Sequence, residues 1–173
     1  MESKVKAMGH PIHQMLIPFP LGLLGTAVIF DIIYLIWHNP TMVTVSYWMI
    51  AAGIVGALSA APFGLIDWLA IPSNTRAKTV GALHGIGNVI MLLLFAGSWY
   101  LRYTSPYFEP HMPTTTAMVL SFAGFALSAV TGWLGGELVD RLSVGVDDGA
   151  NLNAPSSLTN DRVSPGARVQ RGL

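Results

Sequence analysis

The chain has 173 residues, of which 52% are hydrophobic and only 10% are charged, against about 25% charged residues in an ordinary soluble domain. Only 7 of its 18 charges lie in the 126 residues from position 14 to position 139. So few charges cannot cover a globular surface, which excludes a soluble enzyme. The 9 basic and 9 acidic residues, without a long basic run, argue against nucleic acid as a partner. With no cysteine, the chain cannot form a disulfide or a thiolate metal site.

Four apolar stretches dominate the chain, at residues 15–37, 45–69, 80–101 and 116–139. Each is near the ~20 residues that a helix needs to cross a bilayer. Because lipid offers no partner for backbone polar groups, these spans must be helices. The short connections predict an all-α, up-down-up-down bundle of four transmembrane helices. It follows an N-terminal segment (1–14) and precedes an extended C-terminal arm (140–173).

The basic residues predict the orientation of this bundle. Five of those near span ends lie on the side of the N-terminus: Lys4, Lys6, Arg76, Lys78 and Arg141. Only Arg102 lies on the opposite side. By the positive-inside rule, both termini are expected in the cytoplasm.

Small residues recur at helical spacing and predict close helix packing, either within the chain or against other membrane subunits. They are Gly53, Gly56, Ala60 and Gly64 in the second span, Gly81 and Gly85 in the third, and Gly132 and Gly136 in the fourth. The arm has no aromatic residue and cannot form a core of its own. We therefore expect it to lie irregularly on another surface, such as a partner subunit.

Ionisable residues within or beside the spans are costly in lipid and call for a role. With a helical rise of about 1.5 Å per residue, several of them are expected at one level, the cytoplasmic boundary of the membrane. The set comprises His10, His13, Asp67, His84 and Glu137, with Asn88 one turn deeper than His84. Imidazoles and carboxylates gathered from several helices are typical of metal sites, proton relays and bis-histidine haem sites.

Two ligands remain open for this layer. A divalent metal ion would be held directly by the three histidines and the two acids, whereas haem b would take His84 with His13 or His10 as axial ligands. Each acid also has a structural alternative: Asp67 could pair with Arg76 or Lys78, and Glu137 with Arg141. Asp31 lies too far from the layer to join it. We expect it to accept a hydrogen bond from Ser46 or Tyr34, or to stay protonated.

Residues 9–13 (GHPIH) and 16–22 (LIPFPLG) resemble the opening of an uncharacterised bacterial four-span membrane family, domain of unknown function 2231. Further family-like elements are Asp31, residues 64–69, residues 75–78 leading to His84 and Asn88, and residues 132–139. The resemblance covers roughly residues 8–147. The chain departs from it at Gln14, where the family often has proline, and at Asp140, where tyrosine is usual.

The resemblance implies a bacterial inner membrane and a redox context, because such domains are sometimes joined to Rieske-type or cytochrome c modules. Together with the histidines, it predicts a non-catalytic accessory subunit of a respiratory or photosynthetic electron-transfer complex. Its partners would be the lipid bilayer and other membrane subunits. A small transporter for a metal ion or protons is the alternative. The polar layer at one interface, without an inverted repeat or a broken mid-membrane helix, is unfavourable to transport.

Overall fold

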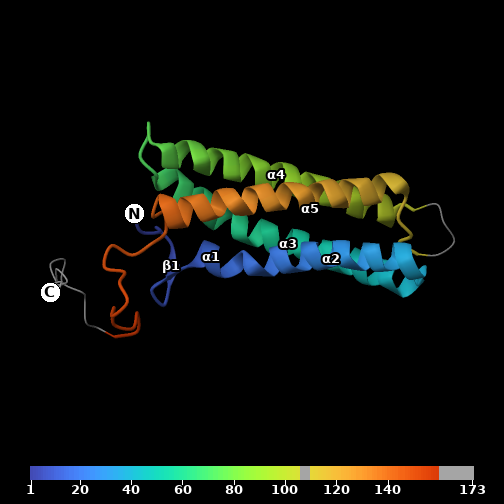
Figure 1. Ribbon diagram of the computed structural model, residues 1–173, viewed down its shortest axis with the longest axis horizontal. Coiled ribbons are helices and arrows are strands. Elements are labelled where there is room, and N and C mark those ends of the chain that lie inside the picture. Colours follow the sequence, from blue (N-terminus) through green and yellow to red (C-terminus); the bar gives the residue numbers. More distant parts are fainter. Residues whose placement is uncertain (106–109, 160–173) are drawn as a thin grey trace, which may run out of the picture.

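The computed structural model describes residues 1–105 and 110–159 of the chain. A two-residue hairpin, β1 (Lys6–Ala7) and β2 (His10–Pro11), precedes the helices. The helices are α1 (Ile12–Leu16), α2 (Pro18–Trp37), α3 (Pro40–Ala70), α4 (Arg76–Tyr103) and α5 (Thr115–Gly136), and a π-helical turn, η1 (Glu137–Arg141), continues α5. The helices run lengthwise beside one another (Figure 1). Helices α1 and α2 together form one span, α3 and α4 form one each, and α5 with η1 forms the fourth. All four are long and apolar enough to cross a membrane, which confirms the predicted four-span bundle.

The helices extend beyond the apolar stretches because polar residues in the connections cap them. The Asn39 side chain accepts a hydrogen bond from the Thr41 amide at 3.0 Å and starts α3. The hydroxyls of Thr75 and Thr114 do the same at the starts of α4 and α5, each at 3.1 Å from the amide three residues on. Such caps satisfy the free N–H groups of a first turn. Helices α3 and α4 therefore begin five and four residues earlier than apolarity alone predicts, and α5 begins one residue earlier.

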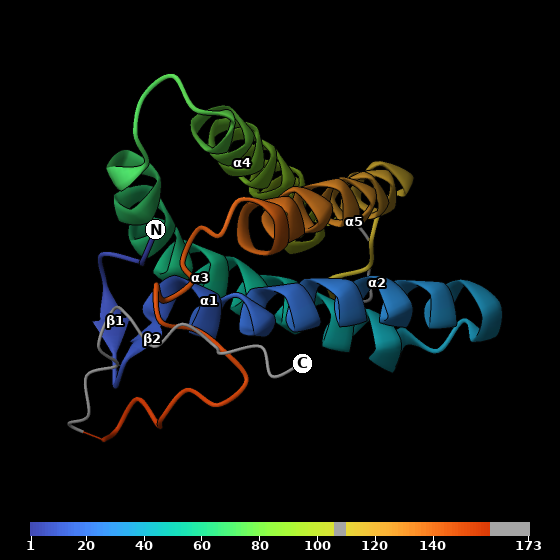
Figure 2. The ribbon, with the colours of Figure 1, turned by 60° about the vertical axis from the view of Figure 1, so that its left-hand side comes forward.

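The bundle consists of two antiparallel pairs, α2 with α3 and α4 with α5. The pairs meet where α2 contacts α5 and α3 contacts α4 (Figure 2). A buried core joins them, formed by Leu24, Ala27, Val28, Ile50, Met91 and Phe95. Most other apolar side chains point outward, as expected for a surface that contacts lipid rather than water.

The small residues of α3 serve packing within the chain, as predicted. Gly53 faces Leu24 and Gly56 faces Phe19, and an added Cβ at either glycine would lie 2.6 Å from the neighbouring side chain. By contrast, Gly85, Gly132 and Gly136 have no neighbour within 4 Å of such an added atom. These three positions are left open on the outside of α4 and α5.

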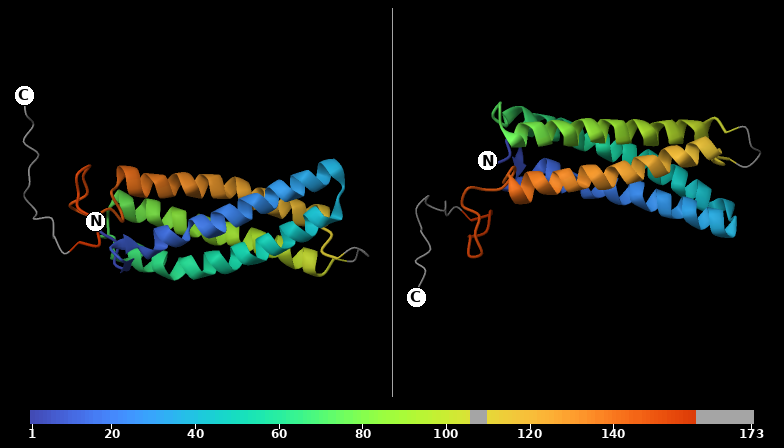
Figure 3. Two further views of the ribbon diagram at one scale, coloured as in Figure 1. Left: turned by 90° about the horizontal axis from the view of Figure 1, so that it is seen from below. Right: turned by 45° about the horizontal axis from the view of Figure 1, so that its top comes forward.

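The N-terminal segment and residues 140–159 of the arm lie together at one end of the bundle, here called the proximal end (Figure 3). The opposite end is called the distal end. The ammonium group of Met1 donates to the Ser143 carbonyl at 2.8 Å, and the Gly145 amide donates to the Met1 carbonyl at 2.9 Å. Lys6 bridges Glu2, at 2.8 Å, and Asp147. Residues 142–159 form turns without a helix or strand. They lie on the chain's own N-terminal segment, and residues 160–173 of the predicted arm lie outside the described residues.

Candidate functional site

His13 and His84 are held in the same way by backbone carbonyls of neighbouring helices. The Nδ1 atom of His13, on α1, lies 3.0 Å from the Ala60 carbonyl oxygen on α3. The Nδ1 atom of His84, on α4, lies 2.8 Å from the Thr131 carbonyl oxygen on α5. A carbonyl oxygen can only accept, so each Nδ1 carries the proton and donates it. Each neutral ring then has its lone pair on Nε2.

Glycines make the space that these rings occupy. A Cβ atom added at Gly64 would lie 2.6 Å from Cε1 of His13, and one added at Gly135 would lie 3.2 Å from Cε1 of His84. Any side chain at Gly64 would therefore displace the His13 ring. The glycine in residues 64–69 of the family-like sequence is explained by this close approach.

Asn88 lies one turn further along α4 and completes the polar contacts of His84. Its amide nitrogen is 3.1 Å from Nε2 of His84 and donates to the lone pair there. Both imidazoles are half-buried. From the predicted set, the structure thus joins His84 with Asn88 and holds His13 by an equivalent contact on the other helices. We call His13 and His84 the histidine pair.

Asp67 is engaged by the N-terminal segment instead of by a ligand. The Ser3 hydroxyl lies 2.8 and 2.7 Å from its two carboxylate oxygens, and the Lys4 amide donates to it at 2.7 Å. The predicted partners Arg76 and Lys78 are not those observed. Lys78 donates to the Trp68 carbonyl at 2.8 Å and lies 4.0 Å above the Trp68 ring.

Glu137 and His10 also have partners of their own. The Glu137 carboxylate accepts a hydrogen bond from Arg76 at 2.5 Å, which joins the end of α5 to the start of α4. The prediction that Glu137 pairs with Arg141 was wrong. His10, exposed on β2, lies 3.4 Å from the Ser157 hydroxyl of the arm. Within the described residues, no three His, Asp or Glu side chains are grouped so as to hold a metal ion. Among the described residues, the five predicted ligands therefore do not form one cluster.

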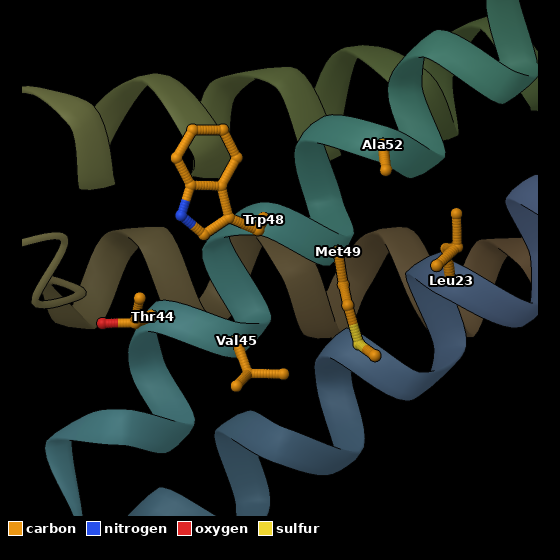
Figure 4. A pocket seen from close by; sticks show the side chains of 6 residues that line it. All are labelled: Leu23, Thr44, Val45, Trp48, Met49 and Ala52. Carbon is orange, nitrogen blue, oxygen red and sulfur yellow. The ribbon is translucent and has the colours of Figure 1, made fainter.

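Two hollows open on the surface away from the histidine pair. One, of about 340 Å³, is almost wholly apolar and lies on the outer side of α2 and α3 near the distal end (Figure 4). Its lining residues are Leu23, Thr44, Val45, Trp48, Met49 and Ala52. The other lies between the N-terminal segment and the connection after α3. Neither is lined by a residue of the histidine pair.

Asp31 and Arg102 form a buried ion pair that the sequence analysis missed. The two carboxylate oxygens of Asp31 accept from the two terminal nitrogens of Arg102 at 2.9 and 2.6 Å, and neither side chain is exposed. The Ser121 hydroxyl donates to Asp31 at 3.2 Å, and Arg102 Nε donates to the Ser98 hydroxyl at 3.3 Å. The expected partners of Asp31 were wrong because α4 continues to Tyr103, which places Arg102 inside the bundle rather than in a loop.

The described part of the chain therefore combines four apolar spans with polar contacts at both ends. A family model described as a predicted membrane protein (DUF2231) matches residues 9–148. No curated protein and no solved structure matches the chain. Since the matched region includes all four spans and both members of the histidine pair, this polytopic membrane protein belongs to the DUF2231 family.

Proposed function

We propose that this chain is a non-catalytic accessory subunit of a larger electron-transfer complex in a bacterial inner membrane, and that the histidine pair holds its cofactor. The observation that carries the proposal is the matched geometry of His13 and His84. Each ring donates through Nδ1 to a backbone carbonyl and keeps its lone pair on Nε2. Histidines that ligate a metal usually hold their second nitrogen in this way, because the contact fixes the ring and its tautomer.

The charges around the pair favour haem b over a divalent ion. Asp67 and Glu137 are bound to Ser3 and Arg76, so that the pair offers two neutral nitrogens and no carboxylate. Two imidazoles match the two axial positions of a haem iron, whereas an ion such as zinc takes about four ligands. When bound, haem would supply one-electron chemistry. The chain's own contribution would be to orient both rings through Ala60 and Thr131, with Asn88 released from Nε2 of His84.

The outer surface supports contact with other subunits. Gly85 and Gly132 directly follow His84 and Thr131, two residues that face each other across the antiparallel pair of α4 and α5. When residues of two antiparallel helices face each other, the next residue of each helix points toward the same side of the pair. Gly85, Gly132 and Gly136 are therefore expected on one side, where small residues would let a partner helix approach closely.

The charged residues at the two ends of the bundle support the predicted orientation and weaken the transporter alternative. Arg76 and Lys78 begin α4 at the proximal end, which would therefore face the cytoplasm. A path for ions across the bundle would need mobile polar groups near the distal end. The ionisable groups that α2 and α4 supply there, Asp31 and Arg102, are bound to each other without exposure.

The test is purification of the tagged full-length chain from membranes of a bacterium that encodes it, in a mild detergent. We expect an assembly larger than the chain with a reducible haem spectrum, and a lower haem content per chain when both His13→Ala and His84→Ala are present. His38→Ala, at the exposed end of α2, is the matched control. An assembly with a haem content that the double variant leaves unchanged would contradict the role of the pair. A chain that elutes alone would contradict the subunit role.

A further inference from the structure

The contacts of the histidine pair repeat at a fixed distance along the sequence. His13 and Ala60 are 47 residues apart, and so are His84 and Thr131. Both members of the second contact follow their counterparts by 71 residues, which is also the separation of Asp31 and Arg102. We call this separation the repeat offset. The glycines beside the two rings, Gly64 and Gly135, are related by the same offset.

The repeat offset also relates a second contact, further along the helices. An added Cβ at Gly53 would lie 2.6 Å from Leu24 and 3.5 Å from Cβ of Leu23. The positions equivalent to these three residues are Gly124, Phe95 and Leu94. There the corresponding distances are 2.9 Å and 3.5 Å. Two independent packing contacts between the first pair of helices thus recur between α4 and α5.

Buried positions follow the same relation even where the residues differ. Ala27 and Ser98 occupy one equivalent position, and Ser46 and Ala117 another, and all four side chains are fully buried. Ser98 donates to the Ala117 carbonyl at 2.7 Å, whereas in the first half the serine is at position 46 and the alanine at position 27. Residues 12–70 and 83–141 therefore share these packing contacts and buried positions.

The contacts between the halves indicate how they are related. Both hairpins start at the proximal end and return to it (Figure 1). Exchanging the two halves puts α4 in the place of α2 and α5 in the place of α3, and the reverse. The contact of α2 with α5 then becomes the contact of α4 with α3. This is the property of a two-fold axis that runs along the bundle. A residue near such an axis meets its own equivalent.

One pair of equivalent residues does meet there, and a second pair lies at equivalent positions. His13 and His84 occupy equivalent positions nearer the proximal end. Asp31 and Arg102, which follow these two histidines at equal intervals in the sequence, meet near the distal end. That interval of about five helical turns spans about 27 Å, close to the thickness of a bilayer core. The histidine pair is alike in both halves, whereas the ion pair has opposite charges.

We infer that the chain is a tandem repeat of one helical hairpin around this axis. Because of Asp31 and Arg102, the inner surface of each half can pack only against the other half. Two copies of the first half would bring two carboxylates together in a fully buried position, and two copies of the second would bring two guanidinium groups together. An unpaired buried charge is strongly unfavourable. The ion pair thus prevents like halves of two chains from associating. This inference does not depend on a cofactor.

The test exchanges the charges between equivalent positions in the full-length chain. Asp31→Arg and Arg102→Asp are each expected to lower the melting temperature in detergent strongly, because like charges then meet. The double exchange should recover most of that loss. A second version of the double exchange adds Ala27→Ser and Ser98→Ala. It transfers the hydroxyl that accepts from the guanidinium to the half that now carries the arginine. If neither version of the double exchange is more stable than the single variants, the equivalence of the two positions is refuted.

Coexpression of the two single variants gives an independent readout. A chain with Asp31→Arg has a guanidinium in both halves, and a chain with Arg102→Asp has a carboxylate in both, so each half can find its opposite charge only in the other chain. Differently tagged Asp31→Arg and Arg102→Asp chains should therefore copurify as a one-to-one dimer, whereas two tagged wild-type chains should not. Failure of the variants to copurify, or equal copurification of wild-type chains, would overturn the proposed pairing rule. Neither readout depends on haem, so the proposed function can fail while this inference holds.

Discussion

Asp31 and Arg102 are joined by two parallel hydrogen bonds at 2.9 and 2.6 Å in a part of the bundle where neither side chain is exposed. The cost of burying each charge is offset only while the other is present. Asp31→Ala or Arg102→Ala is therefore expected to destabilise the protein by about 3–5 kcal/mol. Replacement of both by apolar residues, Asp31→Leu with Arg102→Met, should cost much less. Thermal unfolding in detergent, followed by tryptophan fluorescence, would measure the difference, with His38→Ala as the control. A loss in the double variant equal to the sum of the two single losses would show that the charges are not coupled.

Asp67 fastens the N-terminal segment to the end of α3. Asp67→Ala removes the acceptor for the Ser3 hydroxyl and the Lys4 amide, and hydrogen bonds to a charged group contribute about 1.5–3 kcal/mol. We expect trypsin to cleave after Lys4 and Lys6 on the order of tenfold faster or more, because about 1.4 kcal/mol corresponds to a factor of ten in the open population. The control is Ser59→Ala, whose exposed hydroxyl bonds only to its own helix. Cleavage at the wild-type rate would mean that the segment is held by its other contacts.

The contact between the N-terminal segment and the arm should depend on pH. Hydrogen bonds from Lys6 and the Asp148 amide lower the pKa of Glu2 below its ordinary value of 4.5, so their contribution is present above that value and is lost as the pH falls through the lowered pKa. Hydrogen bonds to Asp147 and Glu2 raise the pKa of Lys6 above 10.5, so its contribution is present below that value and is lost as the pH rises through the raised pKa. The contact should therefore be strongest between these limits.

The absence of native cysteine makes this pH dependence measurable with two spin labels. Met8 and Leu158 are exposed positions on the two segments, and both can be changed to cysteine. The distance distribution between the labels should broaden as the pH falls through the lowered pKa of Glu2 and stay narrow at neutral pH. Glu2→Gln with Lys6→Met removes both titrating groups and should give a broad distribution at every pH. A narrow distribution in that variant would contradict the role of these charges.

Gly64 and Gly135 give the sharpest test of how the histidine rings are seated. Gly64→Ala would place a methyl group 2.6 Å from the His13 ring and break its contact with Ala60. Loss of a contact that orients a ligand usually costs about 10–100-fold in affinity. Haem titration of the purified protein should show such a loss for Gly64→Ala and a smaller one for Gly135→Ala. Gly85→Ala and Gly132→Ala, which have open space, are the controls and should bind like the wild type.

The sequence predicts the spans well because apolarity and length alone define them. It also places Asp67, His84 and Glu137 at the correct end, since the helical rise gives their depth. It does not show which way each side chain points around its helix. In a membrane, the faces toward lipid and toward the core are both apolar, so hydropathy carries little of that information. For this reason Asp67 was not matched with Ser3, nor Glu137 with Arg76.

The ion pair and the repeat were missed for related reasons. Arg102 directly follows the last apolar residue of its stretch, and its place inside α4 depends on the partner charge at Asp31. Few residues are identical at the repeat offset, because packing constrains size and burial more than identity, as with Ala27 and Ser98. The one signal available was that Asp31 and Arg102 follow His13 and His84 at equal intervals.

The most direct measurement of the central claim is the ligand content of the purified chain after haem is supplied. We expect one haem per chain with the low-spin ferric spectrum of two imidazole ligands. His13→Ala and His84→Ala should each abolish that spectrum, whereas His38→Ala should leave it intact. A wild-type chain that binds no haem, or a low-spin spectrum that survives both replacements, would contradict the claim that these two rings form one site.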